Sequence, residues 1–204
     1  MPEFLPADTG KDFELPPTGT HPAICYRIID MGTQQVEFQG AVKYQRKVLI
    51  SWELAHEKMA DGRPFTISKK YTWSTHEKAA LRKDLESWRG RKFGAEDFGL
   101  GGFSMKKLLG VPALLGVVHN FNNGREYANI VAVLAAAKGQ VTHKATNPLL
   151  FFDLEKFDRV VFDSLSDGMK AAIMKAPEYA AALNGGEPPV EYDGPDDDHN
   201  AAPF

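Results

Sequence analysis

The sequence predicts a mainly β domain with one amphipathic helix, in the order β-β-β-α-β-β over residues 20–138. Three observations carry this prediction. Residues 20–73 are rich in β-branched and aromatic side chains that alternate with polar ones, which is the periodicity of half-buried strands. The apolar period then changes to that of a helix. Two further apolar runs follow, and a hairpin signal, Asn123-Gly124, separates them.

Three strands are expected in the first part of this domain. The run HPAICYRIIDMG, residues 21–32, is β-branched and aromatic, and Gly32 is expected to end it. Apolar and polar side chains alternate in residues 44–57 and again in residues 65–73. The dipeptide DG between these two runs indicates a turn, so they are expected to be consecutive strands.

A helix is expected directly after the third strand. Ser74 and Glu77 have the three-residue spacing of a capping box, and the sequence THEKAALRKDLESW follows Ser74. The apolar stripe of this helix consists of Leu81, Leu85 and Trp88. Gly90 is typical of the position just after a helix, so the helix is expected to end there.

The second half of the domain begins with a short helical piece, MKKLLG, and continues with two strands, VPALLGVVH and EYANIVAVLA. Five strands with a helix between the third and the fourth follow the order of the OB-fold, a small, partly open Greek-key barrel. One amphipathic helix can close the open end of such a barrel. We therefore expect a five-stranded OB-fold barrel in residues 20–138.

Three segments flank this domain. Residues 1–19 are acidic and rich in proline, and they are expected to form an arm. Residues 139–186 are expected to be a linker and a helical extension, with a helix near residues 163–176 that ends before Pro177. This region contains too many phenylalanines for a free linker, so it is expected to pack on the barrel. Residues 187–204 contain six acidic and no basic residues, and they are expected to form a disordered tail.

The net charge of −3 conceals an uneven distribution of charge. Residues 20–144 carry 19 Lys and Arg against 11 Asp and Glu, whereas the segments on both sides are acidic. A basic body between acidic ends favours a protein that binds a polyanion. Charges that are merely segregated on a solvated surface are an equal alternative on this observation alone.

Motifs for catalysis and metal binding are not found in the sequence. It lacks a GxxxxGK[ST] loop, an HExxH pair and a CxxC pair, and its six histidines show no metal-ligand spacing. The single cysteine, Cys25, lies in an apolar run, where a small buried side chain is expected; it also favours folding in the cytoplasm. No stretch approaches the roughly 20 apolar residues of a membrane helix. We expect a non-enzymatic protein without a cofactor, a metal or a membrane span.

Cations and aromatic rings follow the elements that form the ligand groove of an OB-fold. That groove lies on the second and third strands, between the first–second and fourth–fifth loops. Single-stranded nucleic acid needs cations along its phosphates and rings that stack on its bases. The candidate residues for binding single-stranded DNA are Lys43, Tyr44, Arg46, Lys47, Trp52, Arg63, Phe65, Lys69, Lys70, Tyr71, Trp73, Phe121, Arg125 and Tyr127.

Strand alternation divides these candidates. It places Phe65, Ile67, Lys69, Tyr71 and Trp73 on one face of the third strand, and Ile67 suggests that this face is core. Burial is favoured over stacking for Trp73, and slightly favoured for Trp52. The better candidates lie in loops or outside the apolar phase, namely Tyr44, Arg46, Lys47, Lys70, Phe121 and Arg125.

Two parts of the sequence resemble single-stranded DNA-binding proteins. The body is similar to bacteriophage-encoded members through RKVLISWEL, GRPFTISKKYTWSTHEKAALRKDLESWRGR and YANIVAV, over roughly residues 18–138. The last residues, DDDHNAAPF, resemble the tail of bacterial members, in which an acidic run precedes a terminal Pro-Phe. The matching residues are Asp196, Asp197, Asp198, Pro203 and Phe204. The spacer HNAA departs from that pattern, because the family usually joins the acids directly to Pro-Phe.

This resemblance implies a protein that coats single-stranded DNA, with little sequence specificity, during phage replication, recombination or repair in the host cytoplasm. It also implies that the tail recruits replication and recombination proteins, with Phe204 in an apolar pocket of the partner. Two alternatives stay open. One is a strand-annealing or RNA-binding OB module, and the other is an OB-containing accessory subunit of a nucleic-acid enzyme.

Overall fold

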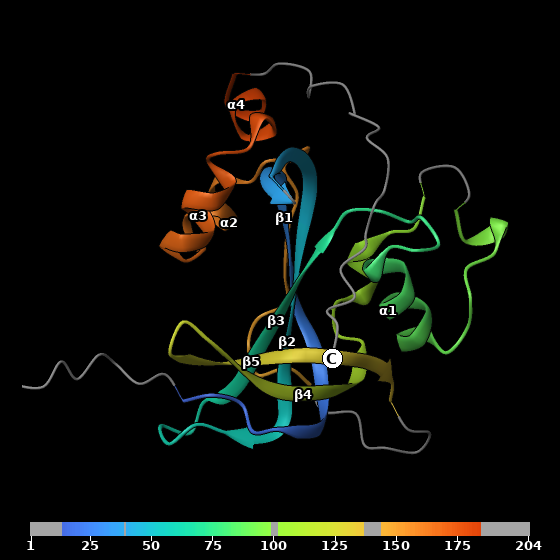
Figure 1. The fold of residues 1–204 in the computed structure, drawn as a ribbon, viewed down its shortest axis with the longest axis vertical. Helices are drawn as coiled ribbons and strands as arrows, with labels where there is room; N and C mark the ends of the chain where they lie inside the picture. Colours follow the sequence, from blue (N-terminus) through green and yellow to red (C-terminus); the bar gives the residue numbers. More distant parts are fainter. Residues whose placement is uncertain (1–13, 39, 99–101, 137–143, 185–204) are drawn as a thin grey trace, which may run out of the picture.

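Figure 1 shows the computed structural model, which describes residues 14–38, 40–98, 102–136 and 144–184. The described residues are mainly β with a few short helices. The strands are β1 (Gly19–Phe38), β2 (Ala41–Lys58), β3 (Pro64–Thr72), β4 (Pro112–Asn122), β5 (Arg125–Ala135) and β6 (Leu150–Phe152). The helices are α1 (Ala80–Arg89), α2 (Arg159–Asp163), α3 (Asp167–Ile173) and α4 (Pro177–Asn184), with 3₁₀ turns at Ala95–Phe98 and Met105–Leu108.

The strands form one open sheet in the order β3-β2-β1-β4-β5, and β6 pairs with β1 beside this path. Every pair is antiparallel except β1 and β6. The hairpins β1–β2–β3, with β4 returning to lie beside β1, make a Greek key. The mainly β class and the β-β-β-α-β-β order are confirmed, but the sheet has six strands and is open.

The two ends of the sheet path meet at α1. β3 and β5 lie side by side, and α1 packs against both of them. The described residues show no hydrogen-bonded pairing between β3 and β5 at this junction. Twist brings the end strands together, and the helix rather than a ladder of hydrogen bonds fills the remaining gap.

The main core lies between the inner face of the sheet and α1. Val48, Ile50 and Trp52 of β2 are at most 1% exposed, so every second residue of this strand points into the core. The predicted apolar stripe of α1, Leu81, Leu85 and Trp88, is buried against it. Trp88 Nε1 donates a hydrogen bond to the carbonyl oxygen of Pro112 at 2.7 Å, and its ring centre lies 5.6 Å from that of Trp52. This contact joins α1 to both β2 and β4.

Helix α1 begins later than the capping-box pattern predicts. It starts at Ala80, and its N-cap residue, Ala79, makes no side-chain capping bond. Ser74 Oγ instead accepts a hydrogen bond from the backbone N–H of His76 at 3.2 Å, which closes a local turn. The predicted end is confirmed, because Gly90 follows the helix in the left-handed conformation with φ of 71°.

The prediction that Gly32 ends the first strand is wrong. β1 continues to Phe38, and Gly32 lies at a bulge in its pairing with β2. The φ of Gly32 is 66°, and a Cβ atom there would lie 2.4 Å from Cβ of Ala176. Glycine is needed because the chain that leads into α4 approaches the backbone of β1 at this point.

Residues 144–184 pack on β1 through β6 and a second apolar cluster. The buried members of this cluster are Ile29, Met31, Phe152, Leu154, Phe162, Leu165 and Ile173. The helix predicted near residues 163–176 is the shorter α3, and Pro177 begins a further helix, α4. Proline suits the first position of a helix, since its missing N–H would have no partner there.

Candidate nucleic-acid interface

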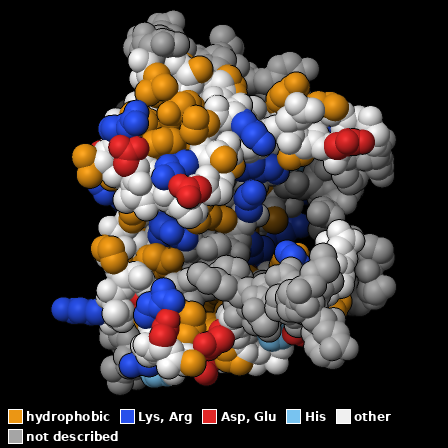
Figure 2. Space-filling model, turned by 90° about the vertical axis from the view of Figure 1, so that its left-hand side faces the viewer, with side chains coloured by type: hydrophobic (Ala, Val, Ile, Leu, Met, Phe, Trp, Pro, Cys, Tyr) orange, Lys and Arg blue, Asp and Glu red, His pale blue; other side chains and the backbone are white. Residues whose placement is uncertain are grey.

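The face of the β1–β2–β3 sheet that points away from the core carries a row of basic side chains. Val48, Ile50 and Trp52 point inward, so the alternate residues of β2 lie on the opposite face, called the outer face below. The basic residues of the outer face are Arg27, Lys43, Lys47 and Lys70. Figure 2 views the molecule from the side away from α1, and it shows Lys and Arg side chains spread over this face, several of them near its middle.

The strand register places polar groups between these cations. Arg27 of β1 pairs with Ser51 of β2, which pairs with Ser68 of β3. Arg27 Nε donates a hydrogen bond to Ser51 Oγ at 3.3 Å, and the two serine hydroxyls are 2.8 Å apart. Lys47 pairs with Thr72, and its Nζ donates to Thr72 Oγ1 at 2.8 Å. The outer face therefore presents cations that are oriented by hydrogen bonds across three strands.

Exposed aromatic rings lie on the two hairpins. On β2, beside the β1–β2 hairpin, Tyr44 is 58% exposed; on the β4–β5 hairpin, Phe121 is 76% and Tyr127 is 46% exposed. The predicted turn between β4 and β5 is confirmed, with positive φ at both Asn123 and Gly124. Figure 1 shows this hairpin projecting to the left, below α2 and α3. Arg125, also exposed, begins β5 directly after the turn.

Arg46 is held by two acidic side chains. Its Nη2 lies 2.6 Å from Asp30 Oδ2, and its Nη1 lies 3.0 Å from Glu155 Oε1. Burial alone would lower the pKa of Arg46, but hydrogen bonds and charge from Asp30 and Glu155 outweigh burial and raise it. The guanidinium also lies 5.3 Å from the centre of the Trp73 ring. Arg46 is therefore better placed to orient Trp73 than to bind a phosphate.

Three candidates for stacking are part of the core, so the prediction is wrong for them. Trp52, Phe65 and Tyr71 are 0%, 8% and 3% exposed. The Tyr71 hydroxyl donates to Asp84 at 2.8 Å, and Lys69 Nζ binds the same carboxylate at 2.7 Å. These side chains share the inner face of the sheet, where the rings cannot reach a base. Lys69 is likewise directed towards α1 and not towards the outer face.

Two further candidates have surroundings that alternation does not reveal. Trp73, for which the sequence favours burial, is 39% exposed because it follows the last residue of β3. Arg63 lies just before β3 and pairs with Asp61 at 2.6 Å, within the β2–β3 turn. Trp73 is thus exposed enough to stack on a base, whereas Arg63 forms an ion pair with Asp61 of the same turn.

Sequence reasoning misses Arg27. Alternation counted from buried Cys25 places Arg27 on the core side of β1. A register shift between Cys25 and Arg27 reverses this, and Arg27 pairs with Ser51 on the outer face. The sequence feature that could have revealed its position is its charge, since an arginine in an otherwise apolar strand is rarely fully buried.

Glu53 fixes the segment after β5 to the outer face. It is 4% exposed and accepts hydrogen bonds from the backbone N–H groups of Thr146 and Asn147, each at 2.8 Å, and from Asn147 Nδ2 at 2.6 Å. Burial acts to raise the pKa of Glu53, and these hydrogen bonds outweigh burial and lower it. The segment therefore covers one end of β2. The extension also borders the cation row, because Leu49, which lies between Lys47 and Ser51 on the outer face, packs against the second apolar cluster.

The described part of the chain contains no group of three or more His, Cys, Asp and Glu that could hold a metal ion. Cys25 is buried as expected, and burial raises the pKa of its thiol to about 12. None of the described helices has the length and apolar character to cross a membrane. The tail candidates Asp196, Asp197, Asp198, Pro203 and Phe204 lie outside the described residues.

A scan against protein-family models finds no match for the chain, and a search of curated proteins finds no significant relative. The basis for assigning a function is therefore the geometry of the outer face and of the two hairpins.

Proposed function

We propose that this chain binds single-stranded DNA with little sequence preference, on the outer face of β1–β2–β3 and between the β1–β2 and β4–β5 hairpins. One observation carries the proposal. The basic residues Arg27, Lys43, Lys47 and Lys70 share one sheet face, and exposed rings lie on the hairpins at its margins. Cations bind phosphates and rings stack on bases, and neither contact depends strongly on sequence.

The strand order supports the assignment of this sheet to the OB-fold. A Greek key of β1 to β4, a fifth strand paired with β4, and a helix at the junction of β3 and β5 are features of that small, partly open barrel. Ligands of OB-folds bind across the second and third strands, between the first–second and fourth–fifth loops. The corresponding elements of this chain are the ones that carry the cations and the exposed rings.

The position of the rings favours single strands over a duplex. Tyr44, Phe121 and Tyr127 are exposed on hairpins, where a ring can stack only on a base that is already unpaired. Readout of a duplex would need an element that enters its major groove, such as an exposed helix or a two-stranded ribbon with donors for base edges. The outer face offers short hydroxyls and cations instead.

A gel-shift comparison tests the proposal. We expect oligothymidylate and a mixed-sequence single strand to bind with similar affinity, and a duplex of the same sequence to bind more weakly. Phe121→Leu is expected to weaken single-strand binding, because stacking contributes about 1–3 kcal/mol per base. The matched control, Val160→Ala, changes another exposed apolar side chain, on α2, and is expected to have no effect. Equal affinity for the duplex would contradict the proposal.

The resemblance to phage single-stranded DNA-binding proteins extends this proposal to replication or recombination, without an enzymatic activity of the chain itself. The acidic segment 187–204 is then proposed to recruit partner proteins. Deleting that segment is expected to preserve or strengthen DNA binding, since acidic residues compete with phosphates for cations. A deletion variant that loses single-strand affinity would contradict this assignment of roles.

A further inference from the structure

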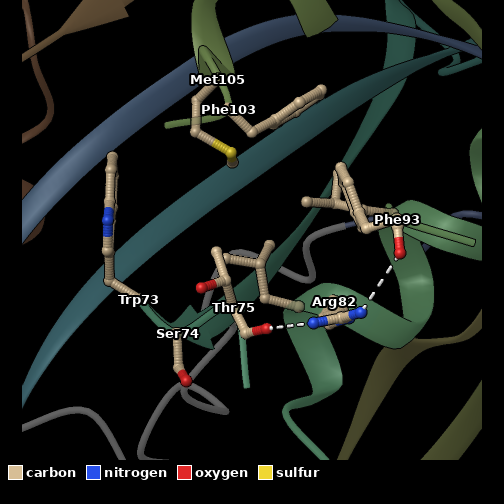
Figure 3. Close-up of a pocket in the computed structure, with 9 residues that line it drawn as sticks. Trp73, Ser74, Thr75, Arg82, Phe93, Phe103 and Met105 are labelled. Atoms are coloured by element: carbon tan, nitrogen blue, oxygen red, sulfur yellow. Dashed lines mark hydrogen bonds between the residues drawn. The ribbon is translucent and has the colours of Figure 1, made fainter. Parts of the chain in front are cut away.

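A small apolar hollow lies where β3 ends against α1, apart from the cation row. Trp73, Thr75, Arg82, Phe93, Phe103 and Met105 are among the residues that line it. Figure 3 shows Trp73 standing at one side, Met105 and Phe103 above, and Phe93 and Arg82 at the other side. The hollow is shallow and open: its wider space of about 360 Å³ includes open solvent, and only about 40 Å³ is cavity volume. It is smaller than the pockets that enclose whole small ligands, so it suits a flat group that stacks on its wall.

The Trp73 ring is oriented before any ligand arrives. Its backbone N–H donates to the carbonyl oxygen of Arg46 at 2.8 Å, which continues the pairing of β2 and β3 by one residue. The Arg46 guanidinium lies over the ring at 5.3 Å and is itself fixed by Asp30 and Glu155. A ring held in this way loses little conformational freedom when a second flat ring stacks on it.

Arg82 has few donors left for a ligand. Its Nη1 donates to the Thr75 carbonyl oxygen at 2.9 Å, its Nε to Glu86 at 3.0 Å and its Nη2 to the Phe93 carbonyl oxygen at 3.5 Å. The remaining walls are mainly apolar or aromatic. The hollow therefore favours a flat aromatic group and offers little to distinguish one such group from another by hydrogen bonds.

The hollow lies next to the proposed path of the phosphates. Thr72, which accepts a hydrogen bond from Lys47 on the outer face, directly precedes Trp73. Because Thr72 points to the outer face and Trp73 lines the hollow, the two surfaces are one residue apart along the chain. Lys106 and Lys107 are exposed and directly follow Met105, which lines the hollow, so positive charge lies near this wall. This charge suits a base that is attached to a phosphate chain.

We propose that the hollow binds one unstacked nucleobase of the single strand, with the base stacked on Trp73. This inference rests on the proposed function, because the cation row has to deliver the strand to the hollow. The site adds affinity but little base specificity, since its walls provide stacking surface and few free hydrogen-bond donors.

Tryptophan fluorescence gives a direct test. The chain has three tryptophans, and Trp52 and Trp88 are 0% and 5% exposed, so Trp73 is the one that a ligand can reach. Oligothymidylate is expected to quench the native protein, whereas an abasic oligomer of the same length should bind more weakly and leave the fluorescence unchanged. Thr75→Tyr fills the hollow and leaves Trp73 in place; it is expected to remove the quenching and weaken binding about 5- to 150-fold. Ser87→Tyr adds the same ring to an exposed position of α1 outside the hollow, and should behave as native.

The outcomes separate the two proposals. Absence of any gel shift with oligothymidylate would overturn the proposed function and this site together. A normal gel shift without quenching, or with Thr75→Tyr indistinguishable from Ser87→Tyr, would overturn the base site alone. Trp73→Leu provides an independent check, and is expected to remove the quenching signal and weaken oligothymidylate binding while leaving the weaker binding of the abasic oligomer unchanged.

Discussion

Gly32→Ala is expected to weaken the attachment of the C-terminal extension to the sheet. Gly32 has a φ of 66°, and an added Cβ atom would lie 2.4 Å from Ala176 Cβ and 2.9 Å from Leu154 Cδ1. The left-handed backbone costs an alanine roughly 1–2 kcal/mol. Overpacking adds about 1–3 kcal/mol, because α4 and Leu154 have to move. The expected loss in free energy of unfolding is therefore about 2–5 kcal/mol.

Gly62→Ala is the matched control for the backbone contribution. Gly62 has a φ of 83°, and an added Cβ atom there would meet no described atom within 4 Å. Its loss is expected to be only about 1–2 kcal/mol. Urea unfolding of both variants, followed by far-ultraviolet circular dichroism, measures the difference. Equal losses in the two variants would refute the inference that the extension packs against β1 at Gly32.

Three other predictions concern buried groups. Trp88→Phe is expected to lower the free energy of unfolding by about 1 kcal/mol more than Trp52→Phe does. The reason is that Trp88 Nε1 donates to the Pro112 carbonyl oxygen, whereas Trp52 Nε1 has no hydrogen-bond partner in the described structure. Similar losses in urea unfolding would contradict this prediction. The Cys25 thiol, with its pKa raised to about 12, should react with a thiol reagent at mildly alkaline pH only after unfolding. Glu53→Gln should be destabilising at neutral pH, and the difference from the native protein should shrink as the pH falls below 4.5, since a lowered carboxyl pKa stabilises the fold only while the group is ionised.

Much of the fold could be predicted because it depends on local sequence. The alternation in β2 and β3, the stop at Gly90 and the turn at Asn123-Gly124 each follow from a few neighbouring residues. β6 could not be predicted, because three apolar residues, Leu150–Phe152, become a strand only through pairing with β1. The end of β1 was misplaced for a related reason. Glycine is needed at position 32 because Ala176, more than 140 positions later in the chain, packs against its backbone.

The candidate site was only partly predictable. Lys47 and Lys70 follow from alternation, since both lie out of phase with the buried apolar residues of their strands. Tryptophan is a residue type that often stacks on bases, but Trp52 is buried because it lies on the same face of β2 as Val48 and Ile50. Alternation does not predict the positions of Arg27 and Trp73. A bulge before Arg27 changes the face on which its side chain lies, and Trp73 follows the end of β3. The sites of irregular backbone are where the sequence pattern is least informative.

The central claim is that cations of the outer face bind the phosphates of a single strand. The salt dependence of oligothymidylate binding tests this claim for the native protein, for Lys70→Gln on the outer face and for Lys83→Gln on α1. Each phosphate contact on a single strand contributes about −0.7 to the slope of log K against log salt concentration. Lys70→Gln should make the slope less steep by about 0.7, and Lys83→Gln should leave it unchanged. An unchanged slope for Lys70→Gln, or equal changes in both variants, would contradict the claim.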